Sequence, residues 1–202
     1  LLMGDLLPKI LKKENFPHLN KKLQKLRKFK KKLAFLAGCH DEDFEFELAS
    51  SGIACVDERG NIYLGEKFLQ LYGDEEELMA GVLGHEIGHR PNGWKDLRKQ
   101  QHLPSSIPEM HEFRRGEETK ADYFMGTALA ELKVNPEPVS HFLISLEGKD
   151  IQQSPLYYPS PMRVEIIKTG YADRLYRLEQ SQKLFPEFHR ATNAADLIAD
   201  DV

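Results

Sequence analysis

Leucines recur at helical spacing near the start of this 202-residue chain. They return at intervals of three, four and seven through residues 18–37, which puts them on one face of a helix. Pro17 and Gly38 stand where such a helix would begin and end. We therefore predict an amphipathic helix whose apolar face carries Leu19, Leu23, Leu26, Leu33 and Leu36.

Alternation replaces helical spacing in the next part of the chain. Phe44, Phe46 and Leu48 alternate with two glutamates, which is the period of a half-buried strand. Residues 53–56 and 62–64 are two further short apolar runs, separated by turn-forming residues. Because short connections favour antiparallel neighbours, the pattern predicts a short, mostly antiparallel sheet.

A second helical pattern contains the sequence His-Glu-Ile-Gly-His. Asp74, with Glu77 three residues later, predicts a capping box at its start. His85 and His89 are four residues apart, so on a helix they project from the same face, one turn apart. Two imidazoles at that spacing can bind one Zn²⁺ at about 2.0–2.1 Å. Glu86 would then lie beside the ion without binding it.

This spacing on a helix is typical of zinc metallopeptidases, although it also arises by chance on surface helices. The carboxylate of Glu86 is placed to take a proton from zinc-bound water, whose pKa the ion lowers to about 7. Gly81, Gly84 and Gly88 lower the helix propensity of the segment. They suggest that the helix packs closely against another backbone or leaves room for the site.

The second half of the chain is predicted to be mainly helical. Residues 95–116 hold helix breakers and are predicted to form a loop-rich crossover. Residues 117–134 carry an apolar stripe at helical spacing, and Glu118 and Asp122 border it, one turn apart. A plain surface helix keeps its acids on the opposite side, so this pair is a candidate for chemistry.

A proline-bounded loop precedes the last predicted helix. Tyr157 and Tyr158 lie between two prolines, which restrict the backbone and can present a side chain at a defined place. The helix that follows, over residues 161–184, is predicted to break at Gly170.

Composition restricts the class of protein. The chain is 41% hydrophobic and 30% charged, which is typical of a soluble globular protein. No apolar run approaches the roughly 18 residues of a membrane span. We predict a cytoplasmic protein without a membrane span, and export stays open because the chain begins with leucine. Cys39 and Cys55 are interpreted as small buried hydrophobes, with a disulfide between them as the alternative.

Basic residues are concentrated near the N-terminus, although the net charge is −4. Residues 8–37 contain eleven lysines and arginines and a single acid, Glu14. Such a surface can meet phosphates or anionic lipid. We favour a packed helix with a solvated lysine face and expect no nucleic-acid partner, because lysine-rich helix faces are common on soluble proteins.

Three motifs follow one another along the chain in a specific order. H-E-I-G-H at 85–89 is followed about thirty residues later by E-T-K-A-D at 118–122, and then by Y-P-S-P at 158–161 before the last helix. This combination resembles gluzincin metallopeptidases of the HtpX and CAAX-prenyl-protease type, especially their soluble single-domain relatives, the minigluzincins.

The resemblance implies a role for five residues. His85, His89 and Glu118 would bind zinc, Glu86 would be the general base, and Asp122 would orient a ligand histidine. Two histidines and a glutamate, with an open position for water, are a known ligand set of catalytic zinc. A ligand histidine usually donates its other N–H to a carboxylate, which suits Asp122.

The chain also departs from the family pattern. The family commonly has His-Pro-Ser where this chain has Tyr158 before Pro-Ser. The resemblance then implies that Tyr158, or failing that Tyr157, donates a hydrogen bond to the developing oxyanion. Packing of both rings under the final helix is the alternative. The family's arginine has no clear counterpart in register, and Arg163 is the nearest. The spacing from His89 to Glu118 also suits regulatory zinc proteases related to phage-repressor-cleaving enzymes.

We therefore predict one α+β domain over residues 1–202 with a small zincin (thermolysin-like) fold. Residues 1–37 would form the basic helix, residues 41–134 the sheet and the zinc-site helices, and residues 135–202 a helical C-terminal part.

The expected function is that of a zinc-dependent endopeptidase that acts on a peptide or protein, with Zn²⁺ as its cofactor. The substrate would lie extended along a sheet edge, at residues 53–56 or 62–64. One alternative is a regulatory protein with a metallopeptidase fold that cleaves or binds one partner. Another is a nucleic-acid or membrane-surface module with a structural metal, whose closed site would have four protein ligands.

Overall fold

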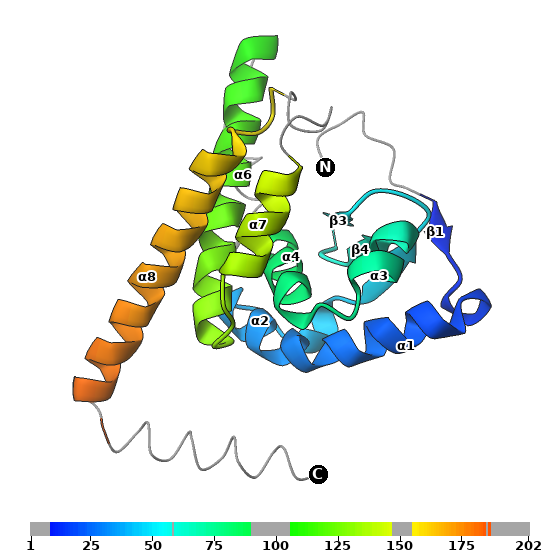
Figure 1. The fold of residues 1–202 in the computed structure, drawn as a ribbon, viewed down its shortest axis with the longest axis horizontal. Helices are drawn as coiled ribbons and strands as arrows, with labels where there is room; N and C mark the ends of the chain where they lie inside the picture. Colours follow the sequence, from blue (N-terminus) through cyan, green and yellow to red (C-terminus); the bar gives the residue numbers. More distant parts are fainter. Residues whose placement is uncertain (1–8, 58, 90–105, 147–154, 185, 187–202) are drawn as a thin grey trace.

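The structure, a computed structural model, describes residues 9–57, 59–89, 106–146, 155–184 and 186. A small sheet and the N-terminal helices lie on one side of the described part, and three helices, α6, α7 and α8, lie on the other (Figure 1). Helix α4 (Glu76–Gly88) lies between them and contacts both α6 and strand β3. The predicted mixture of helices with a small sheet is confirmed.

The sheet has four strands in the order β1-β2-β4-β3. Strand β1 is Ile10–Leu11, β2 is Phe46–Ala49, β3 is Ala54–Val56 and β4 is Ile62–Gly65. The β1–β2 and β3–β4 pairs are antiparallel, whereas β2 and β4 are parallel. The sheet is therefore mostly antiparallel as predicted, but the parallel pair and β1 were not predicted.

The strand order corrects one of the two predicted sheet edges. Strand β4 lies between β2 and β3, so residues 62–64 are internal and only β3 of the two candidates is an edge. Ile62, Tyr63 and Leu64 are all buried, and a continuous apolar run of this kind is typical of a central strand. β3 is shorter and only partly buried, which suits the edge.

The predicted N-terminal helix is present in two pieces. Helix α1 (Pro17–Leu26) and helix α2 (Lys30–Leu36) are joined by a 3-10 turn, η2 (Arg27–Phe29). Pro17 occupies the first helical position, and Gly38 has a φ of 66° just after the end, as predicted. Four of the five predicted leucines are fully buried in the main core, and Leu36 packs against it.

Acidic residues of other elements neutralise much of the basic face. Five ion pairs join Lys13 to Glu47, Lys22 to Asp74, Arg27 to Glu45, Lys28 to Glu76, and Lys30 to Glu45. The packed-helix interpretation is therefore confirmed.

The predicted capping box of α4 is wrong. The residue that precedes the helix is Glu75, and its side chain caps no backbone N–H. The carboxylate of Asp74 instead lies 2.9 Å from the Lys22 ammonium of α1. A tertiary ion pair has replaced the local cap.

Removing the N-terminal helix should destabilise the protein. Leu33 is fully buried, so we expect Leu33→Ala to lower the free energy of unfolding by about 2–5 kcal/mol in urea denaturation. Phe35 lies two residues away but is 76% exposed, and Phe35→Ala should change it by less than about 0.5 kcal/mol. If a chain lacking residues 1–37 melted at the unchanged temperature, the helix would be an independent binding element.

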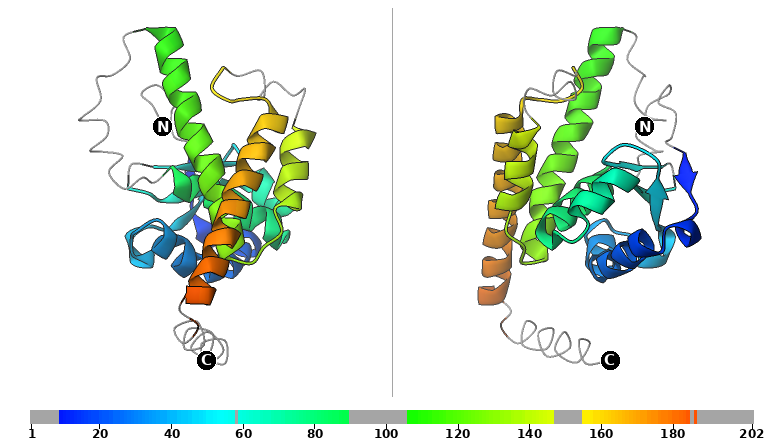
Figure 2. Two further views of the ribbon diagram at one scale, coloured as in Figure 1. Left: turned by 90° about the vertical axis from the view of Figure 1, so that its left-hand side faces the viewer. Right: turned by 45° about the vertical axis from the view of Figure 1, so that its right-hand side comes forward.

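The helical half consists of α6 (Ile107–Glu131), α7 (Glu137–Ser145) and α8 (Ser160–Leu184), and a short helix, α3 (Glu66–Tyr72), precedes α4. Helices α6 and α8 lie side by side in both views of Figure 2. A Cβ on Gly126 would lie 2.0 Å from the Ile167 carbonyl oxygen, and one on Gly170 would lie 2.1 Å from that of Tyr123. The predicted break at Gly170 is therefore wrong, because this glycine serves close helix packing inside a continuous helix.

The start of α6 also differs from the prediction. The helix begins ten residues before the expected position, at a capping box between Ser106 and Glu109. The predicted loop is thus wrong for residues 106–116, because the Ser-Ile-Pro-Glu sequence is itself a helix-start signal. Residues 95–105 of that loop lie outside the described residues.

The two cysteines are less deeply buried than was predicted. Cys39 and Cys55 are half-buried thiols that are not joined by a disulfide. None of the helices in the described ranges combines the length and apolar character that a membrane crossing requires.

Candidate metal centre and active site

Three predicted ligand residues converge where the end of α4 meets the middle of α6. His85 Nε2 lies 3.0 Å from His89 Nε2 and 3.2 Å from Glu118 Oε2, and the Glu118 oxygen lies 3.5 Å from His89 Nε2. Each residue offers one donor atom, and all three atoms lie within 4.8 Å of one another. The cluster joins residues 33 positions apart in the chain, so tertiary packing assembles it.

Glycines on α4 allow the close approach that brings Glu118 to the histidines. A Cβ on Gly84 would lie 3.1 Å from the Cβ of Ala128, and one on Gly88 would lie 3.0 Å from the Cα of Ala121. Ala121 and Ala128 are fully buried residues of α6. The predicted close packing of the motif helix against another backbone is confirmed.

The donor set fits a zinc ion. Ligand distances of about 2.0–2.1 Å place the donors of a tetrahedral site about 3.3 Å apart, close to the separations found here. Two imidazole nitrogens and one carboxylate oxygen are the ligands of a catalytic zinc, which keeps a fourth position open. Within the described ranges, the cluster contains three such residues.

Asp122 lies behind the cluster and is almost fully buried, with 1% of its side chain exposed. Its Oδ1 atom lies 2.9 Å from His85 Nδ1, although the direction of this contact departs from that of a regular hydrogen bond. Arg163 of α8 donates from Nε to Oδ2 at 2.7 Å and from Nη2 to Oδ1 at 2.9 Å. The arginine therefore holds the carboxylate against the imidazole of His85.

Buried charges change the pKa values of these groups. Burial alone would lower the pKa of His85, but Asp122 and Glu118 raise it to about 10. Burial alone would raise the pKa of Asp122, but Arg163 and His85 hold it below its usual value. The pKa of Glu118 is likewise lowered by hydrogen bonds to His85 and His89, against the effect of burial. Both carboxylates are therefore ionised at neutral pH.

Glu86 is buried beside the cluster, with 8% of its surface exposed. Burial raises the pKa of its carboxyl group, and the nearby histidines His85 and His89 act in the opposite direction. Burial, and next the charge of Glu86, raise the pKa of Cys55 in β3 to about 11. Strand β3 also contacts α4, the helix that carries Glu86.

The two loop tyrosines turn toward different arginines. The Tyr157 ring lies 4.9 Å from the Arg163 guanidinium carbon. Burial, and next the charge of Glu118, raise the pKa of Tyr157 well above its usual value. Tyr158 is 38% exposed, and its ring lies 5.8 Å from the Arg115 guanidinium carbon. Tyr157 is thus the tyrosine whose pKa is raised by the carboxylates of the site as well as by burial.

Two other histidines that could have been the third ligand, His111 and His141, are described by the structure and are not part of the cluster. His111 lies on α6 and His141 on α7, where its side chain is 80% exposed and lies 3.7 Å from Glu137. His102 lies outside the described residues. Among the residues of the site, Arg163 had the weakest support from the sequence motifs, because it was only the arginine nearest to the expected register.

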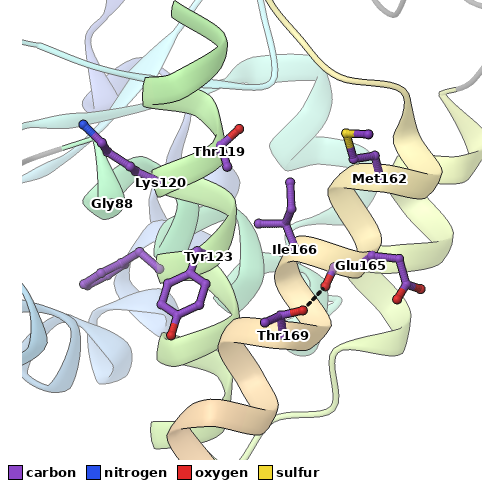
Figure 3. A pocket seen from close by; sticks show the side chains of 9 residues that line it. Gly88, Thr119, Lys120, Tyr123, Met162, Glu165, Ile166 and Thr169 are labelled. Carbon is purple, nitrogen blue, oxygen red and sulfur yellow. Dashed lines mark hydrogen bonds between the residues drawn. The ribbon is translucent and has the colours of Figure 1, made fainter. Parts of the chain in front are cut away.

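A separate groove of about 630 Å³ lies between α6 and α8. Figure 3 shows Thr119, Tyr123, Ile166 and Thr169 along it. Its hydroxyl groups are already used within the protein: those of the two threonines bond to their own helices, and the Tyr123 hydroxyl bonds to Asp173. The groove is mainly apolar, and none of the three cluster residues lines it.

An H-E-x-x-H helix with a glutamate from a following helix, in a mixed α+β fold, is the arrangement of a metallopeptidase. Residues 20–102 match the model of peptidase family M48. This match confirms the predicted relationship to metallopeptidases of the HtpX and CAAX-prenyl-protease type. No curated protein and no solved structure matches the chain. Glu118, Asp122 and Arg163 lie beyond the matched residues, and only tertiary packing brings them to the motif helix.

Proposed function

We propose that the chain is a zinc-dependent endopeptidase of the gluzincin type, built on a small zincin fold. The observation that carries the proposal is the convergence of His85, His89 and Glu118, with the buried carboxylate of Glu86 beside them. The family match supports peptide or protein substrates. When bound, a zinc ion would polarise the scissile carbonyl group and acidify a water molecule.

Glu86 is the proposed general base. Its carboxylate accepts a proton from the attacking water and later gives that proton to the leaving amine, so that the carboxylate is regenerated. Burial raises the pKa of Glu86, which makes it a stronger base than a surface carboxylate.

Asp122 and Arg163 are proposed to position His85. A carboxylate on the Nδ1 side of an imidazole favours the tautomer whose Nε2 is free to bind a metal. Arg163 keeps that carboxylate ionised and in place, because it donates two hydrogen bonds to it.

The edge strand β3 is the proposed docking site of the substrate backbone. An extended peptide can add to an exposed sheet edge through main-chain hydrogen bonds. Strand β3 has β4 on one side and no strand of the described sheet on the other. Its contact with α4 would place such a peptide next to Glu86.

Tyr157 is proposed to be the hydrogen-bond donor to the oxyanion, in preference to Tyr158. We expect Tyr157→Phe to lower turnover by about 10²–10³-fold without changing zinc content, because a single phenolic donor is lost. Tyr158→Phe is the matched control and should stay near wild type, because that ring is turned toward Arg115. Turnover on one peptide substrate and zinc content by atomic absorption are the measurements. A loss confined to Tyr158→Phe would restore the assignment that the sequence motif suggests.

The proposed function itself is tested by digestion of a peptide mixture. Zinc-loaded protein should generate new termini inside peptides, detectable by mass spectrometry, and a chelator should abolish them. A protein that binds zinc with four protein ligands and cleaves nothing would instead be a module with a structural metal.

A further inference from the structure

Arg115 lies on the same stripe of α6 as the residues of the metal cluster. His111, Arg115, Glu118 and Asp122 follow one another at intervals of four, three and four, so they share one face of the helix. Arg115 is thus one turn from Glu118, and side chains at that spacing are neighbours.

The proline-bounded loop ties Arg115 to the site. Arg115 Nη1 donates to the Pro155 carbonyl oxygen at 3.3 Å, and the Tyr158 ring lies over its guanidinium group. Tyr157, the residue before Tyr158 in this loop, contacts Arg163, and burial together with the charges of Glu118 and Glu86 raises its pKa. One short segment therefore spans from Arg115 to the proposed catalytic residues.

Arg115 differs from two other arginines of the helical half in the use of its Nε and Nη2 donors. Arg163 directs both donors to Asp122, and Arg174 directs both to Glu131. Within the described ranges, Arg115 has no carboxylate within ion-pair distance, and its buried Nε atom has no acceptor. Within the part of the chain that the structure describes, no protein group therefore accepts from the pair of donors that matches a carboxylate.

An unused donor pair of this kind is unfavourable in the free protein. A buried N–H without an acceptor loses its hydrogen bond to water and gains none in exchange. A carboxylate that accepted from both Nε and Nη2 would supply the acceptor that the buried Nε atom lacks, and charged hydrogen bonds are stronger than neutral ones.

We propose that Arg115 binds a carboxylate of the substrate close to the scissile bond, so that the enzyme prefers peptides with a carboxylate at that place. The inference rests on the proposed peptidase function. The carboxylate belongs either to an aspartate or glutamate side chain or to the C-terminus of the peptide, because both present the same two oxygens.

Matched peptides distinguish these sources. A series of amidated peptides carries glutamate or glutamine on either side of the cleaved bond, and a second series carries glutamine throughout and ends in a free acid or an amide. Cleavage of each pair by zinc-loaded protein is compared as kcat/KM. Binding is measured by fluorescence anisotropy on the Glu86→Gln chain, which should bind without cleaving. We expect the carboxylate member of one series to be favoured by about 10–100-fold in both measurements.

Arg115→Gln should reduce that preference to about one, and Arg115→Glu should reverse it toward lysine-bearing peptides. Lys120→Gln is the control, because Lys120 carries the same charge on the same helix, but its exposed ammonium group pairs with Glu117. Zinc content should be unchanged in all three variants, and peptide binding is compared at a temperature at which each of them is folded.

The outcomes separate the inference from the proposed function. Preferential binding without cleavage would keep the carboxylate site and overturn the peptidase. Cleavage with no preference in either series, or a preference that survives Arg115→Gln, would overturn the role of Arg115. Peptides that neither bind nor are cleaved would overturn both.

Discussion

Replacing Glu86 with glutamine should lower peptide hydrolysis by about 10²–10⁴-fold and leave the zinc content of the protein unchanged. Glutamine keeps the size of the side chain but cannot accept the proton of the attacking water. The buried position of Glu86 favours this outcome, because little solvent surrounds its carboxyl group and could act as a substitute base.

Glu77→Gln is the control for this measurement. Glu77 lies in the first turn of the same helix and is exposed, so its replacement should change neither turnover nor zinc content. Turnover is measured on one fluorogenic peptide, and zinc by atomic absorption after dialysis. A Glu86→Gln protein with wild-type turnover would refute the general-base assignment, and loss of zinc from it would indicate that Glu86 is a ligand.

Removing a ligand side chain should have the second large effect, the loss of zinc. We expect His85→Ala, His89→Ala and Glu118→Ala to weaken zinc binding by more than the roughly 10–100-fold that is typical of an outer partner. Asp122→Asn should fall within that outer range, because Asp122 contacts His85 and is not one of the three proposed ligands. Competition with a chelator of known affinity gives each value.

The control variants for this measurement replace a residue on the same helix as a ligand, or a residue with the same side chain as a ligand. Glu112→Ala removes an exposed acid two turns before Glu118 on α6, and His141→Ala removes an exposed histidine on α7. Neither should affect zinc affinity. Full zinc occupancy in Glu118→Ala would show that the third ligand is another residue, and His111 would be examined first.

Asp122→Asn should also lower the free energy of unfolding, and this effect must be separated from its effect on zinc affinity. Asp122 and Arg163 are both buried, and Arg163 would be left without its carboxylate. Breaking a buried pair by removing one partner typically costs about 3–5 kcal/mol. Zinc affinity is therefore compared at a temperature at which all variants are folded.

Local patterns in the sequence determined the pieces of this protein. His85 and His89 share a face because an α-helix repeats every 3.6 residues, and this holds wherever the helix lies. The leucines of α1 and α2 are buried for the same reason, since their spacing leaves one continuous apolar face. Each of these predictions depends on residues within a few turns of one another.

Only the tertiary structure decided how the pieces meet. Glu118 reaches His85 across 33 positions, and Arg163 reaches Asp122 across 41, through the close packing of α4, α6 and α8 at glycines. The same packing turns Tyr157 toward the site and Tyr158 toward Arg115, although the two are adjacent in the chain.

Tertiary packing also determined the strand order and replaced the predicted cap of α4 with an ion pair. Strand β4 is central because Ile62, Tyr63 and Leu64 are all buried between neighbours, and Asp74 pairs with Lys22 of another helix. Periodicity determines which side of an element is buried, because it depends on the geometry of that element alone. Which element covers that side depends on the packing of the whole core, and no local pattern in the sequence contains that information.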